Sequence, residues 1–268
     1  VLDDTRRWKD HGATATHYLM VDPADALGRI ADRIATVARD DAWCARWRAA
    51  DDAVRAALAD PGPSDGVVHE GRVVASVLDG LPTRATLVVS SSMPIRDLDA
   101  YGLPRNDEVR VFANRGASGI DGVVSTAFGI ASQRTGPTVC VIGDVAFFHD
   151  QNGLLWSREE DAPVVFVLID NDGGGIFHML PIAEHEPHFT RFFATPHGID
   201  ARHAAEAHGL DFTDVTGEDI AAAVETAVAA GKSAILRVRS DRDENQKMHA
   251  ETRAAVVRSV TEALERLS

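Results

Sequence analysis

The chain has 268 residues, of which 45% are hydrophobic and 25% are charged, as in ordinary globular proteins. A net charge of −14 argues against a partner such as nucleic acid, whose backbone is normally held by a basic stripe. The longest fully apolar run, 162–169, is far shorter than the ~20 residues of a membrane-spanning helix. We therefore expect no nucleic-acid partner and no membrane partner.

The two cysteines, Cys44 and Cys140, are too few for a disulfide framework and form no CxxC pair. The first residues lack the apolar core of a secretory signal, so we expect a cytoplasmic protein. An acidic chain with only three lysines is typical of halophilic proteins, although GC-rich coding produces the same bias. The chain also opens like the middle of a domain, which indicates a fragment of a longer protein.

The N-terminal third is expected to be helical after a short extended stretch. Asp22 and Pro23 predict the capped start of a helix that runs through Ile34. A helical pattern covers 40–60, a loop rich in proline and glycine follows at 61–66, and a further helix is expected near 68–79.

From residue 86 onward, segments typical of strands alternate with segments of helical length. The expected strands are 86–90, 109–113, 138–142, 164–169 and 234–238, and the expected helices are 121–133, 147–160, 200–208, 217–230 and 243–266. This alternation predicts an α/β fold, a parallel sheet flanked by helices on both faces. In such sheets ligands bind at the carboxyl ends of the strands.

Gly143-Asp144-Val145 follows one expected strand and opens a helix. Glycine lets the backbone approach a ligand closely, and the Asp144 carboxylate lies beside the free N–H groups of a helix start. Taken alone, the same residues also fit a plain helix cap.

A second apolar strand runs into Asp170, Asn171 and Asp172 and then into three glycines, 173–175. Oxygen ligands from an asparagine, a backbone carbonyl and a distant aspartate are those that Mg²⁺ prefers. A flexible glycine-rich turn is the alternative. Because 27 positions separate Asp144 from Asn171, one helix and one strand fit between them, and adjacent parallel strands would bring both residues to one sheet edge.

A third run, Asn114-Arg115-Gly116-Ala117-Ser118-Gly119-Ile120-Asp121-Gly122, also follows a strand. An arginine beside glycines at a strand end is well placed for a carboxylate or phosphate, or it lies in a surface loop in contact with solvent. A further segment, Ser90-Ser91-Ser92-Met93-Pro94-Ile95-Arg96-Asp97, precedes it.

The Gly-Asp and Asn-containing motifs together resemble the thiamine diphosphate-binding signature, whose third residue is usually glycine where this chain has Val145. With the two other segments, the chain from about 1 to 215 resembles the 2-succinyl-5-enolpyruvyl-6-hydroxy-3-cyclohexene-1-carboxylate synthases (the MenD family) of menaquinone biosynthesis. That family has a non-glycine residue at the position of Val145. The resemblance implies the C-terminal part of such an enzyme, with 1–38 as the tail of a central domain and 39–268 as the diphosphate-binding domain.

The resemblance implies roles for individual residues. Asp144, Asn171 and the Gly173 carbonyl would bind Mg²⁺ or Mn²⁺, which bridges to the thiamine diphosphate. Arg96 and Arg115 would bind substrate carboxylates, with Ser92 hydrogen-bonding nearby; a helix-capping or surface role is the lesser alternative for Arg96. The remaining cofactor-binding positions would be Gly143, Val145, Gly174, Ile120, Ile176, Phe177 and Leu180. Without the resemblance, Ile120, Ile176 and Leu180 are equally typical of a core.

The family decarboxylates 2-oxoglutarate and adds the succinyl unit to isochorismate, so the resemblance implies both substrates. The glutamate that activates the cofactor comes from a pyrimidine-binding domain of a partner subunit, and no segment here resembles that domain. We therefore expect self-association with a chain or segment that carries this domain, in a homo-oligomer. The isolated chain is expected to bind the cofactor weakly and to be inactive.

Four histidines, His178, His185, His188 and His197, follow the glycine-rich turn. Their spacing fits no common zinc pattern, and a polar lid over the site is the preferred interpretation. Two rival functions remain open: another thiamine diphosphate-dependent decarboxylase or carboligase of the acetolactate synthase type, and a non-catalytic module that binds Mg²⁺ and a diphosphate. A remnant that only dimerises is a third possibility.

Overall fold

The computed structural model describes residues 1–5, 10–35, 40–59, 68–133, 135–159 and 161–267. The chain divides into two compact units, Val1–Ala49 and Ala50–Ser268. The loop expected at 61–66 lies outside the described residues.

The first unit contains the predicted helix α1 (Pro23–Ile34). The Asp22 carboxylate accepts a hydrogen bond from the backbone N–H of Asp25 at 2.8 Å, which satisfies one of the unpaired N–H groups of the first turn. An isolated parallel bridge joins Leu2 to Leu19 in the same unit. The next helix, α2 (Asp41–Ala59), contains the boundary between the units. Both helices confirm the sequence-based expectation.

The second unit is built on a six-stranded, fully parallel sheet with the order β2-β1-β3-β4-β6-β5. Five strands lie where the sequence predicts them, and the α/β fold class is confirmed. The sixth, an edge strand, was missed because its four residues, Asp-Phe-Thr-Asp, are largely exposed and lack an apolar run. The strands are β1 (Thr86–Val89), β2 (Arg110–Ala113), β3 (Thr138–Gly143), β4 (Val164–Asp170), β5 (Asp211–Asp214) and β6 (Ala234–Arg239).

The helices of this unit are α3 (Glu70–Gly80), α4 (Met93–Tyr101), α5 (Val123–Ala131), α6 (Asp144–His149), α7 (Arg202–His208), α8 (Ile220–Ala230) and α9 (Arg242–Glu265). Helix α4 was not expected from the sequence. None of the helices in the described part of the chain combines the length and apolarity needed to span a membrane.

The single helix expected at 147–160 is wrong in detail. Helix α6 ends at His149, and a 3-10 helix follows over Gln151–Arg158. Asp150 interrupts the helix with non-helical dihedral angles, φ −129° and ψ 25°. Its carboxylate instead accepts hydrogen bonds from the backbone N–H and the hydroxyl of Ser125, at 2.7 and 3.0 Å, at the start of α5. These contacts with a residue 25 positions away compete with continuation of the helix.

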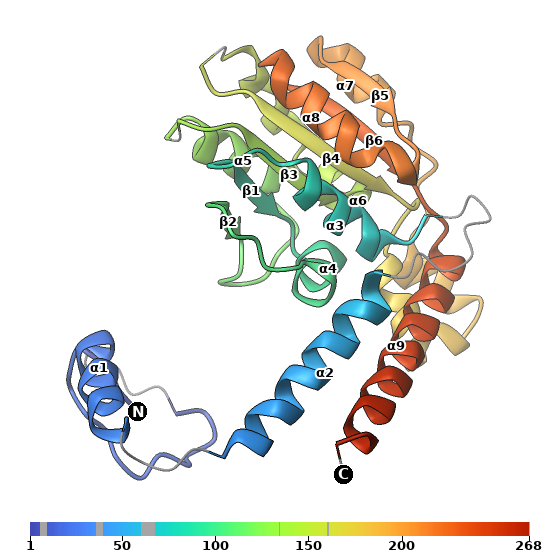
Figure 1. Ribbon diagram of the computed structural model, residues 1–268. Helices are drawn as coiled ribbons and strands as arrows, with labels where there is room; N and C mark the ends of the chain where they lie inside the picture. The colour runs from blue at the N-terminus through green and yellow to red at the C-terminus, as the bar shows by residue number, and fades with distance from the viewer. Residues whose placement is uncertain (6–9, 36–39, 60–67, 134, 160, 268) are drawn as a thin grey trace. The chain divides into compact units, whose positions relative to one another are not determined.

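The sheet has a separate apolar core on each face, and alternate strand residues point to opposite faces. In β3, Val139 and Val141 belong to one core, while Cys140 and Ile142 belong to the other. Helices α3 and α8 cover the first face, and α5, α6 and α7 cover the second (Figure 1). Both faces are therefore closed, as parallel sheets require.

A buried polar chain joins α3, α4 and α9. The backbone N–H of Gly71 donates to Nδ1 of His69 at 3.1 Å, so Nε2 of His69 carries the proton and donates to the Tyr101 oxygen at 3.3 Å. The Tyr101 hydroxyl in turn donates to Nδ1 of His249 at 2.9 Å. Nε2 of His249 then faces a carboxylate oxygen of Asp97 at 3.6 Å.

The two histidines of this hydrogen-bond network, His69 and His249, are neutral in the folded state. Burial lowers the pKa of His69 to about 3 and the pKa of His249 to about 4, from an ordinary value of 6.5. The second cause is positive charge, from His249 on His69 and from Arg253 on His249. Protonation of either ring would also break the donor–acceptor order of the chain.

Replacing His249 with glutamine should flatten the acid side of the stability profile. Above about pH 6.5 the histidine is neutral in both states, so it adds no pH dependence. Below that value His249 binds a proton in the unfolded chain but not in the folded chain, so the free energy of unfolding falls as pH falls towards about 4. Urea unfolding should show that His249→Gln loses about 1.5 kcal/mol less than the wild type between pH 6.5 and pH 5. Equal losses in the two proteins would refute the assignment.

Candidate functional site

The pairing of β3 with β4 places the two motifs side by side. The strands are parallel neighbours, and Gly143, the last residue of β3, is in register with Ile169 of β4. Asp144 is the first residue of α6, and Asn171 comes directly after β4. Both residues therefore lie at the carboxyl edge of the sheet, as the 27-residue spacing predicts.

Asp144 is buried, with 2% of its surface exposed, and is held by three donors. Its Oδ1 accepts from the Val145 N–H at 2.6 Å, and its Oδ2 accepts from the Gly173 N–H at 2.8 Å. Nε2 of His197 lies 3.2 Å from Oδ2. Burial raises the pKa of Asp144, and these hydrogen bonds oppose that rise. A cation beside the carboxylate would favour its ionised form further.

The turn after β4 has an unusual backbone. Asp172 has φ 59° and Gly173 has φ 139°. A side chain at Gly173 would collide with the carbonyl oxygen of Ala194. The next N–H, of Gly174, donates to that same carbonyl at 2.7 Å. The turn is therefore packed tightly against Ala194, and only glycine fits at 173.

Asn171 offers an oxygen that suits a metal. Its Nδ2 donates to Oε1 of Glu70 at 2.8 Å, whereas its Oδ1 is buried and has no hydrogen-bond partner within the described residues. A buried polar atom without a partner is costly unless a ligand or water satisfies it. The Asp144 carboxylate, Asn171 Oδ1 and the Gly173 carbonyl form the all-oxygen set that Mg²⁺ or Mn²⁺ favours, so the residues present fit such an ion.

A cavity of about 170 Å³ gathers most of the predicted cofactor residues. Its wall is formed by residues 143–146 after β3 and by the glycine turn and the residues that follow it, 173–177. The start of α4 and Ile120, in the loop before α5, also line it. The predicted site residues in this wall are Ser92, Ile120, Gly143, Asp144, Val145, Asn171, Gly173, Gly174, Ile176 and Phe177.

Three predicted residues do not line this cavity. Arg96 is exposed on α4, and its Nη1 donates to the Ser92 carbonyl at 2.6 Å. Arg115 is exposed in the loop after β2, and 48% of the Leu180 surface is exposed. The structure thus connects Arg96 to the cavity through Ser92, and it leaves Arg115 and Leu180 outside the wall.

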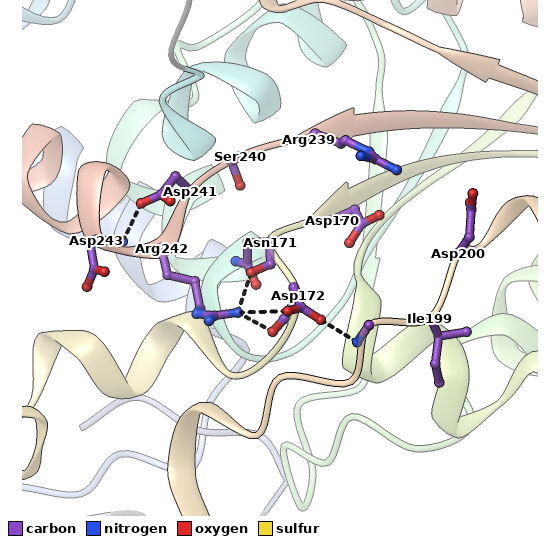
Figure 2. A pocket seen from close by; sticks show the side chains of 11 residues that line it. Asp170, Asn171, Asp172, Ile199, Asp200, Arg239, Ser240, Asp241, Arg242 and Asp243 are labelled. Carbon is purple, nitrogen blue, oxygen red and sulfur yellow. Dashed lines mark hydrogen bonds and ion pairs between the residues drawn. The ribbon is translucent and has the colours of Figure 1, made fainter. Parts of the chain in front are cut away.

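A larger, more polar cavity, of about 420 Å³, also contacts the turn (Figure 2). Asn171 belongs to both cavity walls. Charged side chains from the ends of β4 and β6 and from the loop at 198–200 line it (Figure 2), among them Asp170, Asp172, Asp200, Arg239, Arg242 and Asp243. Only the smaller of these two cavities contains Asp144, Gly173 and the apolar wall in its lining.

Arg242, at the start of α9, fixes the turn from the side of the larger cavity. Its guanidinium donates to the carbonyl oxygens of Asn171, at 2.6 Å, and of Asp172 (Figure 2). The sequence motifs did not predict this residue. It follows β6, the neighbour of β4, so the rule that ligand sites lie at carboxyl strand ends would have pointed to it.

His197 supports the site from a second loop. The N–H groups of His197 and Gly198 donate to Oδ1 of Asp172 at 2.9 and 2.7 Å. The Ile199 N–H donates to Nδ1 of His197 at 3.0 Å, so Nε2 carries the proton and donates to Asp144.

One ring nitrogen of His197, one carboxylate oxygen of Asp144 and one carboxylate oxygen of Asp170 lie within 4.8 Å of one another. Because Nε2 of His197 carries a proton, it is a donor to Asp144 rather than a metal ligand. The lid function expected for the four histidines stays a prediction.

Glu70 is the other residue that the sequence motifs did not predict. It is 1% exposed, lines the smaller cavity and contacts Asn171 from α3, 101 positions away. No local pattern marks it, because an acidic residue in a first helical turn is common on electrostatic grounds alone.

Comparison with known proteins identifies the cofactor class. The family described as thiamine pyrophosphate enzyme, C-terminal TPP binding domain, matches residues 99–238, more than half of the chain. Thiamine pyrophosphate is the same molecule as thiamine diphosphate. The matched range contains Asp144, Asn171 and Gly173.

Two curated relatives are named 2-succinyl-5-enolpyruvyl-6-hydroxy-3-cyclohexene-1-carboxylate synthase. The protein from Roseiflexus castenholzii is 40% identical over 87% of this chain and 40% of its own length. The protein from Halorubrum lacusprofundi is 38% identical over 97% of this chain and 45% of its own length. The chain therefore spans less than half of the relatives that it matches.

A solved structure shares the fold at lower identity. The benzoylformate decarboxylase from Polynucleobacter necessarius superposes with a TM-score of 0.56 and 19% identity, over 68% of this chain and 34% of that protein. At this identity the likeness supports the fold alone.

Replacing Gly173 with alanine should destabilise the second unit and weaken cofactor binding. The new Cβ would meet the Ala194 carbonyl, at a φ that side chains rarely adopt. Backbone strain alone costs about 1–3 kcal/mol, and any shift of the turn displaces the Gly173 carbonyl. Chemical unfolding and calorimetry of Mg²⁺–thiamine diphosphate binding measure the two effects.

Gly129→Ala provides the matched control. Gly129 lies inside α5, and nothing stands within 4 Å of the position that its Cβ would take. The substitution should leave binding unchanged and stabilise the helix by up to about 1 kcal/mol. Equal effects of the two substitutions would contradict the special role of the turn.

Proposed function

Because the chain belongs to the thiamine pyrophosphate enzyme family, whose C-terminal TPP-binding domain it carries, we propose that the protein is a 2-succinyl-5-enolpyruvyl-6-hydroxy-3-cyclohexene-1-carboxylate synthase. In this proposal it decarboxylates 2-oxoglutarate and transfers the succinyl unit to isochorismate, in menaquinone biosynthesis. The cofactors are thiamine diphosphate and Mg²⁺ or Mn²⁺. The proposed activity is taken from the names of the two relatives, and the residues of the site support it.

One observation carries the proposal: the buried Oδ1 of Asn171, to which none of the described residues donates, belongs to the same cavity wall as Asp144 and Gly173. Two adjacent parallel strands deliver these groups to one edge. A sheet-edge turn with no ligand would not need to bury an amide oxygen without a donor. The arrangement therefore supports a metal-bound diphosphate at this position.

In this proposal the chain's residues hold and orient the cofactor. Asp144, Asn171 Oδ1 and the Gly173 carbonyl would hold the metal, and Gly143, Val145 and Gly174, in the same cavity wall, would hold the diphosphate. When bound, thiamine diphosphate supplies the electron sink that decarboxylation of a 2-oxo acid needs. The apolar wall, formed by Ile120, Ile176 and Phe177, keeps water from the reacting centre.

Both proposed substrates carry carboxylates, which requires cations near the cavity mouth. Arg96 lies four residues after Ser92 and bonds to its carbonyl, so one guanidinium nitrogen anchors the side chain while the other N–H groups can meet a carboxylate. Arg115 lies on the neighbouring loop, where it would serve the second substrate. Leu180 would contribute apolar surface beside the exposed rim of the site.

The proposed activity needs more than this chain. The chain spans 40–45% of the length of these two relatives. In the proposal, a pyrimidine-binding domain on another chain or segment completes the site and supplies the activating glutamate, and residues 1–38 form the tail of a central domain. Self-association with that domain would cover the exposed rim of the cavity.

The 268-residue chain alone should bind Mg²⁺–thiamine diphosphate weakly and should not turn over. Release of CO₂ from 2-oxoglutarate in the presence of isochorismate is the direct assay, run with the isolated chain and with a longer protein that includes the pyrimidine-binding domain. Activity should appear only with the longer protein and should disappear after metal chelation. Full turnover by the isolated chain would refute the proposed division of the site.

In the active, longer protein, Arg96→Ala should lower kcat/KM for one carboxylate substrate by on the order of 10- to 100-fold, the equivalent of one lost charge-assisted hydrogen bond. Arg96→Lys should recover only part of the loss, because an ammonium cannot form the bidentate contact. Arg110→Ala is the control, since Arg110 pairs with Glu108 on the exposed surface of β2. A normal kcat/KM for both substrates in Arg96→Ala would remove Arg96 from the site.

A further inference from the structure

Glu70 is unusually buried for an acidic residue in the first turn of a helix. It is 1% exposed, lines the smaller cavity and contacts the turn that follows β4. Buried carboxylates are rare unless they are paired or hydrogen-bonded. The surroundings of Glu70 therefore need a specific explanation.

The carboxylate of Glu70 determines which way the Asn171 amide points. Oε1 of Glu70 accepts hydrogen bonds, whereas an asparagine amide has one donating and one accepting end. With Oε1 of Glu70 only 2.8 Å away, Asn171 must present its Nδ2 to Glu70. The accepting Oδ1 is then turned away from Glu70, where no described residue donates to it.

Glu70 is itself held in place from the opposite end of the sequence. The hydroxyl of Ser240, after β6, donates to the same Oε1 at 2.6 Å. The backbone N–H of Glu70 donates at 3.0 Å to Oδ1 of Asn245, a buried residue of α9. Asn171 and Ser240 therefore both donate to one oxygen of Glu70, and Asn245 of α9 holds its backbone.

We propose that Glu70 is a positioning residue for the metal site, which fixes the Asn171 amide so that Oδ1 faces the cation. This role rests on the proposed metal–diphosphate site and deepens it. Residues that orient metal ligands from behind typically change metal affinity by roughly 10- to 100-fold when they are replaced. Glu70 would act through Asn171 and would not ligate the metal.

The test measures Mn²⁺ affinity by electron paramagnetic resonance, which reports free Mn²⁺, in the presence of saturating thiamine diphosphate. Glu70→Met removes the acceptor but conserves most of the volume, so we expect a folded protein with roughly 10- to 100-fold weaker Mn²⁺ binding. Glu70→Gln keeps an accepting amide oxygen, so its affinity should lie closer to the wild type than to Glu70→Met. Glu70→Ala serves as the second acceptor-free variant, and thermal unfolding checks that each protein folds.

Ser233→Ala is the control for a buried polar group elsewhere in the unit. The Ser233 hydroxyl accepts from the Val164 N–H at 3.1 Å, at the opposite end of β4 from the site. This variant should lower the melting temperature without a change in Mn²⁺ affinity. A purely structural role for Glu70 predicts the same behaviour for Glu70→Met.

The outcomes separate the two proposals. Wild-type affinity in the folded acceptor-free variants overturns the positioning role alone, as does a Glu70→Gln protein that binds as weakly as Glu70→Met. A wild-type protein that shows no Mn²⁺ binding dependent on thiamine diphosphate overturns the metal–diphosphate site and, with it, the role of Glu70.

Discussion

The site depends on the parallel pairing of β3 with β4. The register of this pair places Gly143 opposite Ile169, so the residues that follow the two strands meet at one edge of the sheet. A shift of one residue would turn every side chain of a strand to the opposite face, and both faces are apolar cores. The residues that fill the two cores therefore also fix the separation of Asp144 and Asn171.

The elements that could be predicted from the sequence are those whose signals lie in their own residues or next to them. The five strands that the sequence predicts contain apolar runs, and α1 has a capping aspartate followed by proline. These signals lie within a few residues of each element. The edge strand β5 gains its structure from pairing with β6, and its own residues carry no strand pattern. The break after α6 depends on a contact between Asp150 and Ser125, 25 positions apart.

The same distinction divides the site. Asp144, Asn171 and Gly173 could be predicted because strand ends and glycine runs are visible in the sequence. The groups that hold them, Glu70 and Arg242, contact the turn across 101 and 71 positions, and nothing in the local sequence distinguishes them from ordinary helix-start residues. Orientation of a ligand is a tertiary property, whereas the presence of a ligand residue is a local one.

The electrostatics of the turn explain why orientation matters here. Burial raises the pKa values of both Asp144 and Glu70, because each carboxylate loses water that would stabilise its charge. Hydrogen bonds from Gly173, Val145, Asn171 and Ser240 return part of that stabilisation and fix the geometry. A divalent cation at Asp144 would supply the rest, but only if the nearby amide presents oxygen and not nitrogen. The accepting Oε1 of Glu70 imposes that choice on Asn171, so one buried carboxyl group can prepare the site for a cation that it does not ligate.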